Sequence, residues 1–277
     1  MQDKQIILAP AKLNLFLKVL GRRNDGYHSI RSGITFINLF DKIIIKKSSK
    51  FEINYTGAFK PIDGKYIDCI IKKTFKFLNL DQIISLNISV EKNIPVQGGL
   101  GSASTNAASL ILALENMSII ERKPFAYYAP LGADIPCFLY NKNCLVTGMG
   151  ETVNYLPFPK YYFLIIKPKF KNSTKDMYNK LDLNFIDFDC DQLDNKLEVN
   201  ENDVGNDFEK IIFSQNPDFK EIIVFLENLD NSIFTRITGT GSCCFTVFEK
   251  KEQALKANDI FKSKFTDLWT FVCENNI

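Results

Sequence analysis

A stretch rich in glycine and hydroxyl side chains has the composition of a phosphate-binding loop. It follows the strand-like segment 83–91 and precedes a run rich in Ala and Leu, and its key residues are Gly98, Gly99, Gly101, Ser102, Ser104 and Thr105. Glycine lets the backbone bend sharply and approach a ligand closely, while the first turn of a helix offers unpaired N–H groups to an anion. We therefore expect a strand, an anion-binding loop and a helix in this order.

The spacing within this loop excludes the two commonest nucleotide-binding motifs. No Lys follows the glycines, as G-x-x-x-x-G-K-[ST] requires, and Ser104 stands where G-x-G-x-x-G has its third glycine. A tight strand-to-helix turn without a ligand is the alternative. Hydroxyl side chains crowded beside the glycines favour a phosphate site over that alternative.

Two further segments hold polar side chains that could do chemistry. The predicted strand 13–20 places Lys12 and Asn14 on one face and leucines on the other, because side chains alternate along a strand. Asp134 lies in an otherwise apolar run, and burying a carboxylate is costly unless it is paired or takes part in chemistry. The alternatives are a lysine at the solvated rim of a strand and an Asp that caps a helix or forms a turn.

The turn-rich loop 21–28 ends in Tyr27 and His28, the only histidine of the chain. This pair offers a stacking surface and a ring that both donates and accepts hydrogen bonds, so it could clamp a planar group of a ligand. An incidental histidine in a surface loop is the alternative. A Ser-His-Asp triad or a multi-histidine metal site would have to use this one residue or do without it.

A second glycine-rich segment, Thr238-Gly239-Thr240-Gly241-Ser242, lies between the strand-like runs 233–237 and 243–248. A simple hairpin turn would explain it. Beside the first loop, it suggests two walls of one phosphate site.

Composition narrows the class of protein. The chain has 277 residues, 45% of them hydrophobic, which is enough for a substantial core and two domains. The net charge of +2 does not suggest a nucleic-acid or membrane partner. Seven cysteines without C-x-x-C pairs do not indicate a disulfide framework or a zinc site. No leader segment and no apolar run of about 20 residues is visible, so we expect a cytoplasmic protein.

The remaining patterns predict alternating strands and helices. Strands are expected over 34–38, 42–47, 51–55, 161–166 and 267–273, and helices over 66–80, 175–181, 219–229 and 251–264, with another that ends near 213. Residues 182–207 are rich in Asp, Asn and Glu, which is typical of a long surface connection.

Four segments, taken together and in this order, resemble the GHMP kinase superfamily: Pro10–Leu15, the loop 94–108, Leu131–Pro136 and Thr238–Ser242. More narrowly, Gly26-Tyr27-His28-Ser29 and Gly132-Ala133-Asp134-Ile135-Pro136 resemble the branch that acts on a cytidine diphosphate-linked methylerythritol. The resemblance spans nearly the whole chain. It implies an α+β, two-domain GHMP kinase fold, with an N-terminal ATP-binding domain over 1–155 and a C-terminal ferredoxin-like α/β sandwich domain over 156–277.

The resemblance also implies an activity. This is ATP-dependent phosphorylation, with Mg²⁺, of the 2-hydroxyl of 4-diphosphocytidyl-2-C-methyl-D-erythritol, a step of the non-mevalonate (MEP) isoprenoid route. Asp134 would act as the base and Lys12 beside it would stabilise charge. The ATP phosphates would lie against Pro95, Val96, Gly98, Gly99, Leu100, Gly101, Ser102, Ala103, Ser104 and Thr105. We expect a small-molecule substrate, no nucleic acid or membrane partner, and a monomer or homodimer.

The same resemblance assigns the substrate residues. Tyr27 would stack on the cytosine, His28 would hydrogen-bond to its edge, and Tyr178 would cover the other face. The other expected substrate contacts are Asn14, Thr174, Gly239, Thr240 and Gly241. The metal ligands are not indicated.

Some residues depart from the family pattern. Its loop usually has Gly-Leu-Gly-Gly-Gly-Ser-Ser, where this chain has Ser102, Ala103 and Thr105 in place of two glycines and a serine. A Cβ atom restricts positive φ, so either these positions have ordinary backbone angles or the loop is held differently. Asp68-Cys69-Ile70-Ile71 replaces the family's Asp-Asn-Leu-Ile.

Two other functions stay open. One is a GHMP small-molecule kinase of the homoserine or mevalonate type, against which the Tyr27–His28 pair argues, because those substrates carry no planar base. The other is a catalytically silent GHMP-fold sensor of nucleotide or sugar, against which Lys12 and Asp134 argue.

Overall fold

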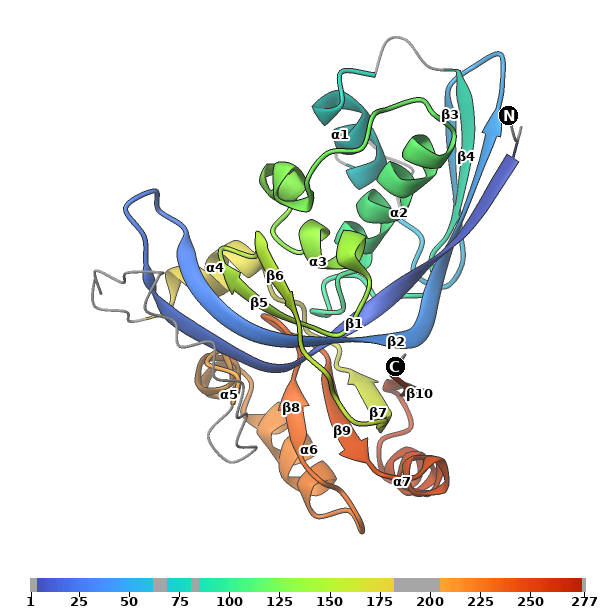
Figure 1. Cartoon of the computed structure of the whole chain (residues 1–277). Helices are drawn as coiled ribbons and strands as arrows, with labels where there is room; N and C mark the ends of the chain where they lie inside the picture. Colours follow the sequence, from blue (N-terminus) through green and yellow to red (C-terminus); the bar gives the residue numbers. More distant parts are fainter. Residues whose placement is uncertain (1–3, 62–68, 81–84, 182–204, 276–277) are drawn as a thin grey trace. The chain divides into compact units, whose positions relative to one another are not determined.

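The computed structural model describes residues 4–61, 69–80, 85–181 and 205–275 (Figure 1). Its strands are β1 (Lys4–Arg22), β2 (His28–Lys47), β3 (Glu52–Thr56), β4 (Leu86–Glu91), β5 (Cys144–Gly148), β6 (Thr152–Tyr155), β7 (Tyr162–Lys167), β8 (Thr235–Ile237), β9 (Cys244–Phe248) and β10 (Trp269–Glu274). Its helices are α1 (Ile70–Phe77), α2 (Ser102–Asn116), the 3₁₀ helix η2 (Phe125–Leu131), α3 (Ile135–Tyr140), α4 (Thr174–Asn179), α5 (Glu209–Gln215), α6 (Pro217–Glu227) and α7 (Lys251–Lys264). Within these described ranges, no helix has the length and apolar character needed to cross a membrane.

The chain forms two compact units, each assembled from separate stretches. Unit 1 contains Met1–Ala11, Leu39–Val96 and Gly101–Asn141, and unit 2 contains Lys12–Asn38, Gln97–Leu100 and Lys142–Ile277. β1 and β2 contribute residues to both units, because each is one long strand. The domain boundary expected after residue 155 stays a prediction.

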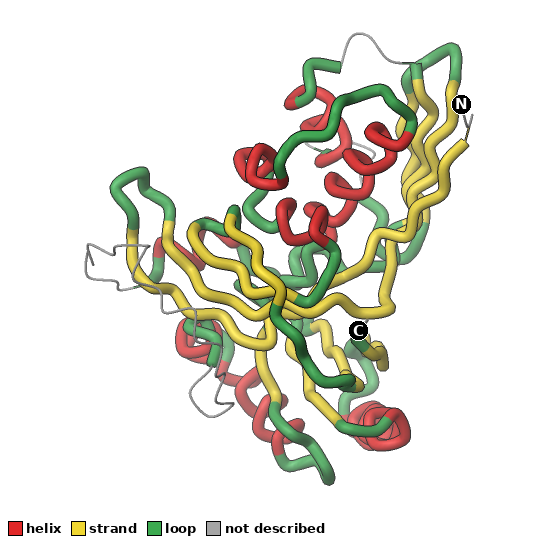
Figure 2. Tube along the Cα trace, in the orientation of Figure 1, coloured by secondary structure: helices red, strands yellow, loops and turns green. Residues whose placement is uncertain are grey.

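Unit 1 packs helices against a sheet (Figure 2). The end of β2 pairs antiparallel with β4, and β4 pairs parallel with β3. Alternate residues of these strands, such as Ile43 and Ile88, point into a core whose helical side comes from Ile71, Phe75, Leu110, Ala113 and Leu114. The predicted amphipathic helix is present as α1, although residues 62–68 lie outside the described part of the chain.

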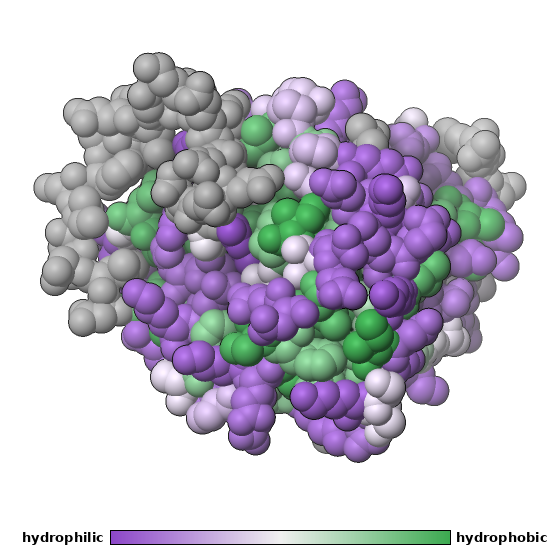
Figure 3. Space-filling view, turned by 90° about the horizontal axis from the view of Figure 1, so that it is seen from below, coloured by the Kyte–Doolittle hydropathy of each residue, from purple (hydrophilic) through white to green (hydrophobic). Residues whose placement is uncertain are grey.

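Unit 2 contains an antiparallel sheet with the strand order β10-β7-β9-β8. The register places Cys244 at the start of β9 opposite both Ile166 of β7 and Ile237 of β8. The end of β7 and the turn that follows β8 therefore lie at the same end of the sheet. The face of the molecule drawn in Figure 3 is mostly hydrophilic, with smaller hydrophobic patches between the polar residues.

Several elements differ from the sequence-based expectation. The strands expected over 34–38 and 42–47 are one continuous strand, β2, because the carboxylate of Asp41 is satisfied by buried partners and does not interrupt it. The hairpin of β5 and β6 was not predicted; Gly148 and Gly150 supply its positive φ angles of 72° and 133°. The predicted surface connection 182–207 lies almost wholly outside the described residues.

Candidate active site

The first turn of α2 is arranged as an anion site. Gly101, which precedes the helix, has a left-handed φ of 73°, and no side chain in the described structure caps the helix start. The first turn also contains no acidic residue, so its N–H groups and the helix dipole act without a competing negative charge. These features fit the phosphates of ATP.

The departures from the family's loop sequence do not strain the backbone. Ser102, Ala103, Ser104 and Thr105 all belong to α2, and none of them has a positive φ. The expectation that these positions have ordinary backbone angles is therefore confirmed. The hydroxyl oxygen of Thr105 is buried and has no hydrogen-bond partner within the described ranges, so a polar group at this end of the helix is left unused by the protein.

The two glycine-rich segments lie against each other in unit 2. The backbone N–H of Cys243 donates to the carbonyl of Gly98 at 3.1 Å, and the hydroxyl of Thr238 donates to the carbonyl of Gly99 at 3.2 Å. Gly99 has a φ of 76°, and a Cβ atom there would collide with the carbonyl of Thr238. Only glycine fits this approach of two backbones, as expected for paired walls of one site.

Lys12 and Asn14 share one face of β1, as the alternation predicted. Both are buried; the Lys12 ammonium donates to Oδ1 of Asn14, and Nδ2 of Asn14 donates to Oγ of Ser32 at 2.8 Å. The backbone N–H of Asn14 donates to the hydroxyl of Thr238 at 3.1 Å. The alternative of a lysine at a solvated rim is thus wrong, and the cation is held next to the second glycine segment.

Asp134 lies at the start of α3 in unit 1 and is half-buried. Its side chain makes no capping hydrogen bond to the helix, so the alternative of a helix-capping Asp is wrong. The alternative of an Asp within a turn matches the structure, because the N–H of Ile135 donates to the carbonyl of Gly132 at 2.9 Å across this segment. The neighbouring Gly132 approaches α2: a Cβ atom on it would lie 3.7 Å from Oγ of Ser104. The segment that carries Asp134 therefore lies beside the first turn of the predicted ATP-binding helix.

The ring of His28 contacts the ring of Tyr178, and not that of Tyr27 next to it in the sequence. Its ring centroid lies 4.9 Å from that of Tyr178 at an interplanar angle of 31°, and Tyr178 packs edge-on against Phe208. Burial, and then the positive charge of Arg22, lower the pKa of His28 below 6.5, which favours the neutral ring. Tyr27 is 60% exposed.

The other expected substrate residues gather at the turn after β8. The hydroxyls of Thr174 and Thr240 lie 3.2 Å apart, and Nδ2 of Asn172 donates to the carbonyl of Thr240 at 3.1 Å. Lys167, which the sequence did not single out, donates to Oγ of Ser242 at 2.7 Å, and burial lowers its pKa. The register of β7 against β9 explains this contact, because the end of β7 meets the turn.

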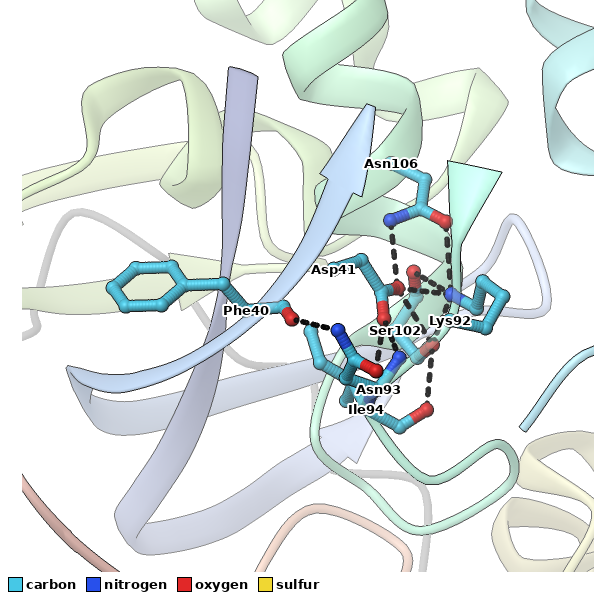
Figure 4. A network of polar contacts seen from close by, with 7 residues as sticks. All are labelled: Phe40, Asp41, Lys92, Asn93, Ile94, Ser102 and Asn106. Atoms are coloured by element: carbon cyan, nitrogen blue, oxygen red, sulfur yellow. Dashed lines mark hydrogen bonds and ion pairs between the residues drawn. The ribbon is translucent and has the colours of Figure 1, made fainter. Parts of the chain in front are cut away.

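A second group missed in the sequence lies beneath α2 (Figure 4). Asp41 of β2, Lys92 just after β4, and Ser102 and Asn106 of α2 form a buried network. Burial lowers the pKa of Lys92, and the neighbouring carboxylate of Asp41 opposes that shift. Asp41 lies on β2 and Lys92 follows the last residue of β4, and charges on or next to strands that alternate polar and apolar residues are expected to face solvent.

In the described part of the chain, no cluster of three or more His, Cys, Asp or Glu side chains is arranged to hold a metal ion.

Comparison with known proteins identifies the family. The models described as "GHMP kinases N terminal domain" and "GHMP kinases C terminal" match residues 65–142 and 186–267. A protein of Francisella tularensis subsp. novicida (strain U112), named 4-diphosphocytidyl-2-C-methyl-D-erythritol kinase, is 35% identical over 88% of this chain and 87% of its own length.

Comparison with solved structures supports the same family and fold. A crystal structure of 4-(cytidine 5'-diphospho)-2C-methyl-D-erythritol kinase superposes with a TM-score of 0.77 and 25% identity, covering 99% of this chain and 100% of its own. The mevalonate kinase of Methanococcus jannaschii, at 18% identity and a TM-score of 0.59 over 99% of this chain and 98% of its own, shares the fold. The predicted α+β, two-domain GHMP kinase fold is confirmed. The chain is an ATP-dependent small-molecule kinase, and it belongs to the 4-diphosphocytidyl-2-C-methyl-D-erythritol kinase family of the GHMP kinase superfamily.

Proposed function

We propose that this kinase transfers the γ-phosphoryl group of ATP to the 2-hydroxyl of 4-diphosphocytidyl-2-C-methyl-D-erythritol, giving the 2-phosphate and ADP within the MEP route to isoprenoid precursors. The relatives carry this substrate in their names. In this chain, the observation that supports a cytidine-containing substrate is the contact between the rings of His28 and Tyr178. A neutral imidazole beside an aromatic ring can stack on a planar base and hydrogen-bond to its edge.

The ATP phosphates are proposed to lie against the loop and the first turn of α2. Pro95 and Val96 lead into the loop, Gly98 to Gly101 form it, and Ser102 to Thr105 present the first N–H groups of the helix. Mg²⁺ would accompany ATP and neutralise charge on its phosphates. The chain's own contribution is a rigid set of backbone donors, which need no reorganisation when charge develops on the transferred group.

Asp134 is proposed as the base and Lys12 as the charge stabiliser. Phosphoryl transfer needs mainly positioning and charge stabilisation, plus one group that accepts the proton of the attacking hydroxyl. Asp134 supplies a half-buried carboxylate at the start of α3, beside the first turn of α2. The Lys12 ammonium, held by Asn14, would oppose the negative charge of the phosphoryl oxygens.

The substrate is proposed to contact the aromatic residues at one end and the second glycine segment at the other. Tyr27, His28 and Tyr178 would hold the cytosine. Asn14, Thr174, Gly239, Thr240 and Gly241 would contact the rest of the molecule. The hydroxyls of Thr174 and Thr240 and the amide of Asn14 are all donors that suit phosphate or sugar oxygens.

The decisive assay measures ADP release from the purified chain with ATP, Mg²⁺ and 4-diphosphocytidyl-2-C-methyl-D-erythritol. The same assay is run with methylerythritol phosphate, homoserine and mevalonate. We expect turnover only with the cytidyl compound. Equal rates with and without the cytidine would refute the aromatic assignment, and a faster reaction with homoserine or mevalonate would identify a different kinase. No ADP release with any of them would indicate a nucleotide or sugar sensor.

A matched pair of variants tests the cytosine site. Tyr178→Phe keeps the ring beside His28, whereas Tyr178→Leu removes it. We expect Tyr178→Leu to raise KM for the cytidyl substrate by about tenfold, the contribution of one stacked base, and Tyr178→Phe to leave it nearly unchanged. An equal effect of the two changes would contradict the stacking role.

A further inference from the structure

A buried ion pair of unit 1, formed by Asp41 and Lys92, contacts the residues on either side of the predicted ATP loop. The side chain of Asp41 is fully buried and that of Lys92 is 6% exposed. Oδ1 of Asp41 accepts the backbone N–H groups of Asn93 at 2.7 Å and Ile94 at 2.9 Å. Oδ2 accepts from the Lys92 ammonium and from Nδ2 of Asn106 at 2.9 Å. Both charges are therefore compensated by partners from three separate segments (Figure 4).

The Lys92 ammonium is saturated by protein acceptors. Besides Asp41, it donates to Oγ of Ser102 at 2.6 Å and to Oδ1 of Asn106 at 2.8 Å. An ammonium group has three donors, and all three are used. Lys92 therefore has no hydrogen available for a phosphate, which makes it a supporting residue and not a ligand.

The network joins the two ends of the loop. Ile94 is the last residue before Pro95, and Ser102 is the first residue of α2. Asp41 holds the N–H of Ile94, and the hydroxyl of Ser102 donates to the carbonyl of Ile94 at 3.3 Å. Residues 95–101 thus form a loop whose entry and exit are tied to each other and to one buried charge pair.

The hydrogen bonds of Lys92 also set the orientation of the first turn of α2. Lys92 contacts Ser102 and Asn106, which are one turn apart on the same face of α2. Two points of attachment fix the rotation of the helix as well as its position, and this determines where its first N–H groups point. A buried ion pair contributes little net stability compared with a well-packed apolar pair, so a positional role accounts for it better than a stabilising one.

We propose that Lys92 and Asp41 are positioning residues for ATP, and that Ser102 serves the loop in two ways. Its backbone N–H faces the phosphates, while its hydroxyl anchors the helix to Lys92. The inference rests on the proposed ATP site and goes beyond it by assigning the Ser102 side chain to the anchor instead of to the nucleotide. Loosening the anchor should weaken ATP binding and leave the cytidyl substrate unaffected.

The test compares Ser102→Ala with Ser109→Ala. Both changes remove a buried hydroxyl from α2, but the structure gives Ser109 no contact with Asp41 or Lys92. The dissociation constant of ATP with Mg²⁺ is measured by calorimetry, and KM is measured for each substrate, below the melting temperatures of these two variants. We expect Ser102→Ala to weaken ATP binding about tenfold, as for loss of one charge-assisted hydrogen bond, without changing KM for the cytidyl substrate. Ser109→Ala should match the wild type.

Lys92→Met provides a second variant with a larger expected loss of ATP affinity. Because Ser102→Ala removes only one acceptor, it remains informative even when Lys92→Met melts below the assay temperature. Unchanged ATP affinity in Ser102→Ala, or an equal loss in Ser109→Ala, would overturn the inference. Failure of the wild-type chain to bind ATP would instead refute the proposed function, and the inference with it.

Discussion

Breaking the Asp41–Lys92 pair should destabilise the protein strongly, while replacing both partners should not. Lys92→Met leaves a fully buried carboxylate whose remaining donors are uncharged: two backbone N–H groups, the amide of Asn106 and, at 3.5 Å, the hydroxyl of Ser102. Asp41→Asn leaves the ammonium of Lys92 uncompensated. Loss of one member of a buried pair costs about 3–5 kcal/mol. For a chain of this length, that lowers the melting temperature by about 6–10 °C, at about 2 °C per kcal/mol.

The double variant Asp41→Asn/Lys92→Met removes both charges. The amide of Asn at position 41 can still accept the N–H of Ile94, and the methionine fills the volume of the lysine stem. We expect the free energy of unfolding to recover, so that the double variant is at least about 2 kcal/mol more stable than the sum of the single effects implies. Urea unfolding followed by circular dichroism measures all four proteins. Single effects below about 1 kcal/mol, or strictly additive effects, would show that the two charges do not stabilise each other as the geometry requires.

Four further outcomes are expected. His28 is the only histidine of the chain, so its ring proton gives a single NMR titration; burial and Arg22 should place its midpoint below 6.5, and a midpoint at or above 6.5 would contradict that environment. Since the unfolded chain binds this proton more readily, stability should fall slightly as the pH drops from 6.5 through the folded pKa, as scans at successive pH values can check. Asp134→Asn should lower kcat by about a thousandfold with the melting temperature unchanged, and near-normal turnover would exclude it as the base. Gly99→Ala should cost more stability than Gly26→Ala, because both have positive φ but only the first adds a collision with Thr238; equal melting temperatures would refute the close approach.

The sequence was sufficient for the residues whose type is dictated by the backbone. Gly99 and Gly101 have the left-handed angles that glycine favours, and the two glycine segments meet as expected. Lys12 and Asn14 share a face because alternation along a strand is a local property. Such features depend on neighbours in the chain and are therefore visible without a structure.

Features that depend on distant partners were not visible. Asp41 and Lys92 are 51 residues apart, and each looks like an ordinary charge on a half-exposed strand until β2, β4 and α2 are packed together. The ring partner of His28 lies on α4; the family resemblance assigned both His28 and Tyr178 to the cytosine, but it did not predict that their two rings contact each other. The continuity of β2 was missed as well, because the partners that satisfy the buried carboxylate of Asp41 between the two predicted strands are distant in the sequence.

The interleaving of the two units along the chain has a consequence for biosynthesis. All stretches of unit 1 have been synthesised once Asn141 is made, including β3, β4, α1 and α2. Residues 12–38 and 97–100 belong to unit 2 and must wait for partners made much later: Asn14 bonds to Thr238, 224 positions further on. Contacts of such long range form slowly. The growing polypeptide can thus complete unit 1 while Gly98 and Gly99 still lack their neighbours, which exist only once Thr238 and Cys243 have been made.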